Sequence, residues 1–193
     1  MKKLILILIA ALAPQLYAGG LPARSKKMDS KPKTETATLA GGCFWGVEDI
    51  LRALPGVTET VVGYTGGKTD NPKYEDVKTG KTGHAESIEL RFDPAKITYG
   101  AILDMFFRMH DPTTPNRQGN DIGSQYRSAI FYHGEEQKKE AEAAVLRAQA
   151  SGRWKRPVTT EVVPAVSFWP AEDYHQDYLK KHVGGYTCHY IRD

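Results

Sequence analysis

Hydrophobic residues follow two different periods along residues 37–193, and the change from one period to the other predicts alternating strands and helices. Residues 37–41 form a short apolar run of the kind found in strands, and residues 57–64 are rich in β-branched side chains. Between these runs, apolar residues recur at the spacing of a helix face, at Phe44, Val47, Leu51 and Leu54. Pro55 and Gly56 end this helix, so the first unit is predicted to be strand, helix, strand.

A further strand is predicted at residues 84–92, and its alternating side chains place Glu86 in one row with Ile88, Leu90 and Phe92. A carboxyl group in such an apolar, core-facing row loses solvation, so its pKa should rise above the usual value for glutamate. A glutamic acid that is neutral near pH 7 can donate a proton. The pattern fits equally well with a solvated Glu86 that lies just before the strand.

The second half of the chain repeats the alternation after one long irregular segment. A helix follows Thr98, which can act as its N-cap, and Asp111 with Pro112 ends it. Residues 111–127 are irregular, and loops of this length in compact domains are usually functional or disordered. Beyond them we expect strand, helix, strand, helix and coil, at residues 128–133, 135–150, 159–164, 170–182 and after Gly184. This order predicts the α+β class, as a two-layer α/β sandwich with a mixed sheet and a coil-rich C-terminal tail.

The first 36 residues differ in composition from the rest of the chain. Residues 1–18 combine a basic start, an apolar run too short to span a bilayer and a passable cleavage site, which together predict a secretory signal peptide. Residues 19–36 are polar and basic and contain Pro and Gly, as is typical of a flexible tether. We therefore expect an exported, periplasmic protein whose folded domain is residues 37–193, with membrane tethering if the leader is not cleaved.

The net charge of +3 is unevenly distributed along the chain. Residues 1–36 carry seven Lys and Arg against two Asp and Glu, a charge of +5, whereas residues 37–193 carry 19 against 21, a charge of −2. A nucleic-acid-binding domain usually has its own basic patch. The charge distribution therefore argues against nucleic acid as a partner.

The chain contains two cysteines, and Cys43 lies at the predicted strand-to-helix turn, directly after Gly41 and Gly42. Unpaired backbone N–H groups and the helix dipole at this position favour the thiolate, which is the nucleophilic form. The paired glycines let the backbone turn sharply and leave the sulfur open to a ligand. Because Phe44 and Trp45 follow at once, the sulfur is expected beside an apolar surface. These features point to an enzyme that attacks a small, partly apolar group.

The second cysteine, Cys188, lies in a Gly-rich segment where the chain can move. Two cysteines in an exported chain often form a permanent structural disulfide. An activated Cys43 and a mobile Cys188 instead suit a bond that forms and breaks. Both interpretations are open at this stage.

Several separate motifs resemble those of the peptide methionine sulfoxide reductase A family, and they occur in the order of that family. Gly42-Cys43-Phe44-Trp45-Gly46 resembles its active-site signature. The other matching motifs are Val62 to Gly67, Asn71 to Tyr74, Gly83 to Glu86, Asp111 to Thr114, Gln118 to Gly123, Gln125 to Ser128 and Ala171 to Gln176. The family fold is a ferredoxin-like α/β sandwich, which agrees with the elements predicted above.

The resemblance implies reduction of the S epimer of methionine sulfoxide, free or in proteins, to methionine. In that scheme the Cys43 thiolate attacks the sulfoxide sulfur, and Glu86 supplies the proton that the departing oxygen needs. Tyr74 and Tyr126 would hold this oxygen through their hydroxyl groups as negative charge builds on it. Methionine leaves, and Cys43 becomes a sulfenic acid.

The resemblance also assigns residues to substrate binding. Phe44 and Trp45 resemble the apolar walls that take the S-methyl group, and Asp121 and His175 resemble contacts to the substrate backbone. By its helical spacing Phe44 could equally be an ordinary core residue. A lone histidine such as His175 on a helix is more often structural than functional.

In the same scheme Cys188 attacks the sulfenic acid, releases water and forms a disulfide with Cys43, which a thioredoxin-type protein then reduces. With two cysteines in the sequence, we expect a two-cysteine cycle. We expect no bound cofactor and no metal, because His84, His133 and His175 lack the spacing of metal ligands. The enzyme is expected to act as a monomer.

Two other functions are compatible with the sequence. A cysteine hydrolase could use Cys43 with a histidine base such as His175, and it would need neither a second cysteine nor a buried carboxyl donor. An exported binding module could contain a static Cys43–Cys188 disulfide. Peptide cleavage would favour the hydrolase, and a disulfide that resists a thioredoxin-type reductant would favour the binding module.

Overall fold

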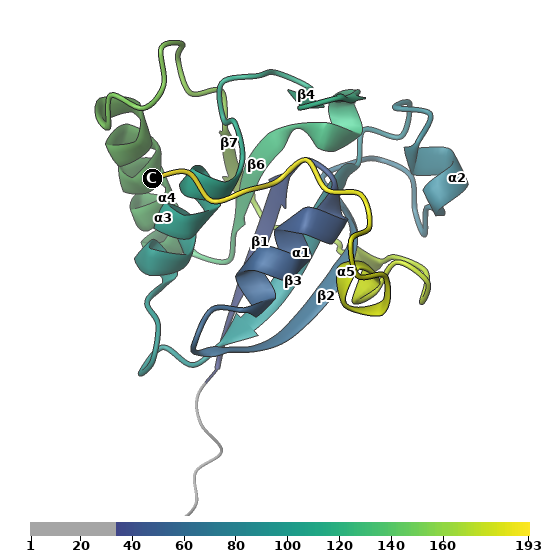
Figure 1. Ribbon diagram of the computed structural model, residues 1–193, viewed down its shortest axis with the longest axis horizontal. Coiled ribbons are helices and arrows are strands. Elements are labelled where there is room, and N and C mark those ends of the chain that lie inside the picture. The colour runs from purple at the N-terminus through teal and green to yellow at the C-terminus, as the bar shows by residue number, and fades with distance from the viewer. Residues whose placement is uncertain (1–33) are drawn as a thin grey trace, which may run out of the picture. The chain divides into compact units, whose positions relative to one another are not determined.

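A computed structural model gives the fold of residues 34–193 (Figure 1). The predicted signal peptide and most of the predicted tether lie outside the described residues. The elements in chain order are β1 (Glu35–Gly41), α1 (Phe44–Arg52), β2 (Val57–Thr65), α2 (Tyr74–Val77), β3 (Ala85–Phe92), α3 (Tyr99–Met109), β4 (Arg117–Gln118), β5 (Asp121–Ile122), the 3₁₀-helix η1 (Ser124–Tyr126), β6 (Ser128–Tyr132), α4 (Glu135–Ala150), β7 (Glu161–Pro164), β8 (Trp169–Pro170) and α5 (Tyr178–Lys181). In this part of the chain no helix is long and apolar enough to cross a membrane.

The main sheet has the strand order β7-β6-β1-β3-β2-β8. Neighbouring strands are antiparallel except β6 and β7, which are parallel, so the sheet is mixed as predicted. The four central strands and the helices α1 and α3 have the order of a ferredoxin-like sandwich, with β3 between the parallel strands β1 and β2. After α4 the chain forms β7 at the edge of the sheet beside β6, and it then returns to form β8 beside β2 at the opposite edge.

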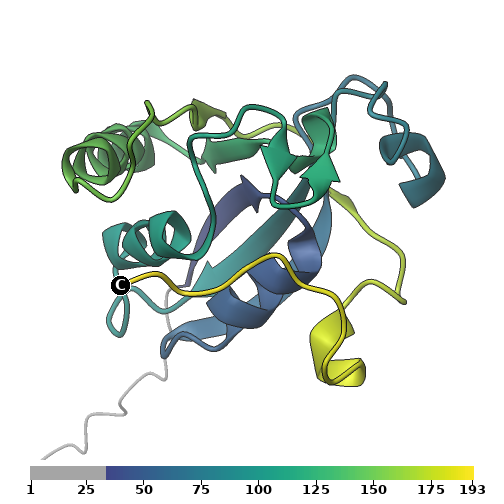
Figure 2. The same ribbon diagram turned by 45° about the horizontal axis from the view of Figure 1, so that its top comes forward.

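Helices α1, α3 and α4 pack on one face of the sheet and form the second layer of the sandwich (Figure 2). The shared core is formed by alternate residues of the strands and by one side of each helix. It includes Ala37 and Leu39 of β1, Ile88, Leu90 and Phe92 of β3, Ile130 of β6, Leu51 of α1, Phe106 of α3 and Ala144 of α4. The predicted two-layer α+β architecture is confirmed.

The folded domain begins slightly before the predicted boundary. Glu35 and Thr36, which the sequence placed in the tether, belong to β1 and pair with Phe92 and Arg91 of β3. Pairing with a central strand outweighs the polar composition that marked these residues as tether.

The helix predicted at residues 170–182 is wrong for most of its length, because only Tyr178–Lys181 is helical. The side chain of Gln176 makes two hydrogen bonds to the backbone of Val62 in β2, at 2.9 Å each. Asp177 has a left-handed backbone with φ of +54°, which interrupts any continuous helix through this segment. Tertiary contacts to β2 therefore override the helical pattern.

The irregular segment at residues 111–127 is organised by one side chain. Gln118 is buried, and its amide accepts from the backbone N–H of Asp111 at 3.0 Å and donates to the Asp111 carbonyl at 3.2 Å. These bonds close the loop between Asp111 and Gln118, and the β4–β5 hairpin and η1 follow directly after it. As a result Asp121 and Tyr126 are presented from a fixed loop.

We predict that Thr98→Ala lowers the free energy of unfolding by about 1 kcal/mol, the usual worth of an N-cap. The Thr98 hydroxyl accepts a hydrogen bond from the Ala101 N–H at 3.1 Å, as the predicted N-cap requires. Urea denaturation of both proteins measures the difference. Thr98→Ser keeps the hydroxyl and should stay near the wild-type value, so an equal loss in both variants would show that the cap is not the cause.

Candidate active site

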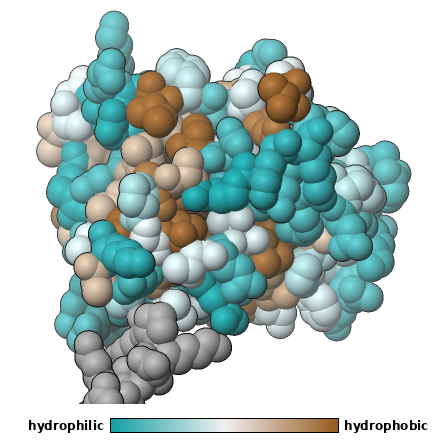
Figure 3. All heavy atoms as spheres, turned by 60° about the horizontal axis from the view of Figure 1, so that its bottom comes forward, coloured by the Kyte–Doolittle hydropathy of each residue, from teal (hydrophilic) through white to brown (hydrophobic). Residues whose placement is uncertain are grey.

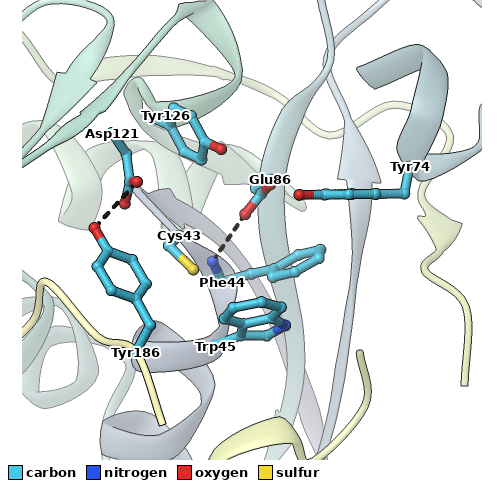
Figure 4. Close-up of a pocket in the computed structure, with 8 residues that line it drawn as sticks. All are labelled: Cys43, Phe44, Trp45, Tyr74, Glu86, Asp121, Tyr126 and Tyr186. Carbon is cyan, nitrogen blue, oxygen red and sulfur yellow. Dashed lines mark hydrogen bonds between the residues drawn. The ribbon is translucent and has the colours of Figure 1, made fainter. Parts of the chain in front are cut away.

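The residues singled out in the sequence converge on one pocket of about 200 Å³ where β1 leads into α1 (Figure 4). Its walls come from α1, α2, β3, β5, η1 and the C-terminal tail. The lining residues are Cys43, Phe44, Trp45, Tyr74, Glu86, Asp121, Tyr126 and Tyr186. All the predicted site residues except Cys188 and His175 are therefore in the pocket lining.

Cys43 is the N-cap residue of α1, as the sequence predicted, and its side chain is buried. Gly42 before it has φ of +103°, a conformation that side chains rarely adopt. A Cβ atom on Gly42 would also lie 2.6 Å from the side chain of Gln118. Glycine is therefore required at the turn that places Cys43 at the helix end.

The predicted low pKa of Cys43 is wrong for the unliganded site. Burial raises the pKa of this thiol well above its usual value, and the negative charge of Glu86 adds to the shift. The backbone N–H of Trp45 acts in the opposite direction but is the smaller effect. The helix end is present, yet desolvation outweighs its field, so Cys43 rests as a thiol.

Glu86 lies inside β3, on the face that packs against the helices, so the buried alternative from the sequence is confirmed. One carboxyl oxygen accepts a hydrogen bond from the Phe44 N–H at 3.1 Å. Burial raises the pKa of Glu86 to about 8, although the Phe44 N–H lowers it. Glu86 is therefore a neutral acid at pH 7, which also removes its charge from the neighbourhood of Cys43.

Tyr74 and Tyr126 reach the pocket from opposite sides, and both hydroxyl groups point toward Glu86 (Figure 4). Burial raises the pKa of both side chains, so both phenols keep their protons near neutral pH. Glu172 holds Tyr74 in place by accepting a hydrogen bond from its backbone N–H at 3.0 Å. The two hydroxyls and the Glu86 carboxyl thus form a group of three proton-bearing oxygens.

Phe44 and Trp45 form the apolar wall beside the Cys43 sulfur (Figure 4). The Trp45 ring stacks on Tyr178 with ring centroids 3.7 Å apart. The Phe44 side chain is almost fully buried in a small core with Tyr64 and Val77. Phe44 therefore belongs to both the core and the pocket wall.

His175 lies behind this wall rather than in the pocket lining, and its predicted contact with the substrate backbone stays a prediction. Its Nδ1 accepts a hydrogen bond from the Trp45 indole N–H at 3.1 Å, and its ring lies 4.7 Å from that of Tyr74. Within residues 34–193 no histidine is hydrogen-bonded to the Cys43 sulfur, so the hydrolase pairing lacks its base. His175 instead supports Trp45 and Tyr74.

Asp121 lines the pocket, and its carboxylate is bound by the C-terminal tail. One oxygen accepts from the Tyr186 hydroxyl at 3.1 Å and the other from the Cys188 thiol at 3.4 Å. Tyr186 was missed in the sequence, where its only signal is an aromatic residue two positions before a cysteine. The tail therefore forms one side of the pocket through Asp121.

Cys188 and Cys43 are both free thiols in the structure. The tail that carries Cys188 crosses the N-terminal end of α1 (Figures 1 and 2). The Cys188 sulfur lies close enough for its charge to raise the pKa of Cys43, and the Cys43 backbone N–H lowers the pKa of Cys188. Burial and Asp121 raise the pKa of Cys188 to about 12.

The arrangement combines a nucleophilic sulfur, a neutral acid, two hydroxyl donors, an apolar wall and a second thiol. Such a set suits attack on a small polar group that carries an oxygen and an apolar substituent. Among the described residues, no group of three or more His, Cys, Asp and Glu side chains is arranged to hold a metal ion.

Known proteins are similar to this chain in sequence and in fold. The sequence pattern of the family described as peptide methionine sulfoxide reductase matches residues 35–193. Peptide methionine sulfoxide reductase MsrA 1 of Mesorhizobium japonicum is 55% identical over 159 residues, which are 82% of this chain and 90% of that protein.

Two solved structures of Mxr1 from Saccharomyces cerevisiae are similar to this fold. The reduced form matches with a TM-score of 0.79 and 39% identity, over 85% of this chain and 95% of that chain. Mxr1 in complex with Trx2 matches with a TM-score of 0.58 and 28% identity, over 85% and 94%. With its family pattern matched along the whole folded domain, the chain belongs to the peptide methionine sulfoxide reductase family.

Proposed function

We propose that this enzyme reduces the S epimer of methionine sulfoxide through a Cys43 sulfenic acid and a Cys43–Cys188 disulfide. Its membership of the family makes it an oxidoreductase acting on methionine sulfoxide. One observation carries the finer scheme. The neutral Glu86 carboxyl and the hydroxyls of Tyr74 and Tyr126 line the same small pocket as the Cys43 sulfur (Figure 4).

The pocket gives each substituent of the sulfoxide sulfur a different partner. The methyl group fits against Phe44 and Trp45, while the oxygen fits among Glu86, Tyr74 and Tyr126. Because a sulfoxide sulfur is chiral, exchanging these positions would put the oxygen against aromatic rings and leave it without donors. This asymmetry supports selection of one epimer.

In the first half-reaction the Cys43 sulfur attacks the sulfoxide sulfur, and Glu86 gives its proton to the oxygen. The sulfur–oxygen bond of the substrate breaks, the oxygen passes to Cys43, and methionine leaves with two more electrons on sulfur. Cys43 is thereby oxidised to the sulfenic acid. The thiol proton of Cys43 replaces the proton that Glu86 gave, so the acid ends this step neutral.

In the second half-reaction Cys188 attacks the Cys43 sulfenic acid, forms the disulfide and releases water. Both sulfurs are free, and the tail holds Cys188 near the Cys43 backbone. A thioredoxin-type protein then reduces the disulfide by supplying two electrons and two protons. The similarity to Mxr1, solved in complex with Trx2, supports this type of donor.

Methionine sulfoxide, free or in proteins, is thus the proposed substrate of an exported monomer. The pattern of residues 1–18 supports export to the periplasm, with tethering if the leader stays. On the face seen in Figure 3, hydrophobic residues form several small patches among hydrophilic ones rather than one continuous surface.

Cys188→Ser should release about one methionine per enzyme in a single turnover with the S epimer, yet fail to recycle with thioredoxin. The serine leaves the Cys43 chemistry intact but cannot form the disulfide. Quantifying methionine by chromatography after mixing measures the burst, and Cys43→Ser as control should give none. Full recycling by the Cys188 variant would remove Cys188 from the cycle.

Glu86→Gln should slow methionine release in a single turnover by about 100-fold, because it removes the proton donor. Since the pKa of Glu86 is about 8, the acid form is present below that pH, and the wild-type rate should fall as the pH rises through it. The Glu86→Gln variant should lack this decline. Glu89→Gln on the opposite face of β3 is the matched control, and equal rates of methionine release in the two variants would contradict the donor role.

If the protein is exported, the leader is cleaved after Ala18, and the periplasmic protein should begin at Gly19. The mass of the intact protein from separated cell fractions measures where the chain starts. Leu8→Arg, which interrupts the apolar run, should keep the uncleaved chain in the cytoplasm. Wild-type protein found with its leader in the cytoplasm would count against export.

A further inference from the structure

His189, the residue after Cys188, is the least expected component of the site. It was not singled out in the sequence, yet the side chain is almost fully buried against the start of α1. Its Nε2 lies 2.7 Å from the Gly41 carbonyl oxygen, and its Nδ1 lies 3.5 Å from the Cys188 sulfur. The imidazole therefore connects the strand end before Cys43 to the second thiol.

The contact with Gly41 fixes which ring nitrogen carries the proton. A carbonyl oxygen only accepts hydrogen bonds, so Nε2 must be the donor. Burial lowers the pKa of His189, which keeps the ring neutral near pH 7. In a neutral ring with a proton on Nε2, the lone pair is on Nδ1, and this lone pair faces the sulfur of Cys188.

The ring position depends on the absence of a side chain at Gly46. A Cβ atom there would lie 2.5 Å from His189 Nδ1, and it would also collide with the Thr187 hydroxyl. The same hydroxyl accepts a hydrogen bond from the His189 backbone N–H at 3.1 Å. The first turn of α1 and the tail are thus shaped to hold this imidazole at the reacting sulfur.

Asp121 is the other acceptor near the Cys188 thiol, at 3.4 Å. Its negative charge, after burial, raises the pKa of Cys188, so it binds the thiol but opposes its ionisation. Its other oxygen is already bound to Tyr186. A neutral imidazole does not oppose the thiolate, and once protonated it stabilises the negative sulfur. His189 is therefore the better proton acceptor of the two.

We propose that His189 is the general base of the second half-reaction, an inference that rests on the function proposed above. Nδ1 takes the thiol proton of Cys188 as its sulfur attacks the Cys43 sulfur. The sulfur–sulfur bond forms, the sulfur–oxygen bond of the sulfenic acid breaks, and Glu86 protonates the departing hydroxyl to give water. The imidazolium then loses its proton to solvent, and Glu86 regains one.

The groups around His189 determine the expected pH dependence. Burial is the largest effect on the pKa of His189 and lowers it; the hydrogen bond with Gly41 and the charge of Asp121 raise this pKa, and Arg192 lowers it. His110, the other buried histidine nearby, has a pKa lowered to about 3 by burial and stays neutral. The base is therefore available throughout the neutral range, and it is lost only as the pH falls below the usual histidine pKa.

The test compares two rates in one single turnover: release of methionine, and loss of two hydrogens from the protein as the disulfide forms. His189→Gln keeps an N–H donor toward Gly41 but has no basic nitrogen at the sulfur. Methionine release should match wild type, and disulfide formation should be about 100-fold slower at pH 7. The slow rate should rise about tenfold per pH unit toward pH 9, because the thiol must then ionise unaided.

His182→Gln, on an exposed histidine that follows α5, is the matched control and should leave both rates unchanged. Should His189→Gln fail to fold, His189→Asn replaces it. This variant puts a non-basic amide near the position of Nδ1, and the same two rates are compared. Wild-type disulfide formation in a folded variant would overturn the base assignment, and so would a slowing that is equal at every pH. Absence of methionine release by the wild-type protein would instead contradict the proposed function.

Discussion

The structure depends on one costly placement, a carboxylic acid inside the sandwich. Glu86 occupies a core-facing position of β3, and burial raises its pKa to about 8. The usual pKa of this carboxyl, taken for the unfolded chain, is 4.5. The raised pKa therefore lowers the free energy of unfolding as the pH rises from 4.5 to 8, by roughly 5 kcal/mol in total. The cost is tolerated because a solvated carboxyl would be ionised at pH 7 and could not protonate an oxygen.

The start of α1 is the second organising feature, because Cys43, Glu86 and the tail that carries Cys188 come together there. Its first N–H groups surround Cys43 and Glu86, and Gly41, Gly42 and Gly46 let other segments approach closely. Three bulky groups use this space: the Phe106 ring beside Gly41, the Gln118 side chain beside Gly42 and the His189 ring beside Gly46. The helix end stabilises negative charge through its N–H groups, but the groups packed around it also remove Cys43 from water. Burial is the larger of these two effects, so it decides that Cys43 is a thiol.

The aromatic wall is held by residues that lie outside the pocket lining. His175 bonds the Trp45 indole and packs on Tyr74, and Glu172 accepts bonds from Tyr74 and Tyr64. These contacts bring α2, β2 and the segment before α5 to one place. The shortened α5 follows from the same packing, since the Gln176 side chain in this segment is hydrogen-bonded to β2.

Local periodicity was enough to place most strands and helices and to put Cys43 at a helix start. It also put Glu86 in the apolar row of its strand, but only the structure showed that this carboxyl is buried. These features follow from spacing along the chain, which the sequence displays directly. Only tertiary structure decided that Cys43 is a thiol, that His175 lies behind Trp45, and that residues 170–177 are not helical. Desolvation and hydrogen bonds between distant residues control all three, and the approach of His189 to Cys188 depends on the same long-range packing.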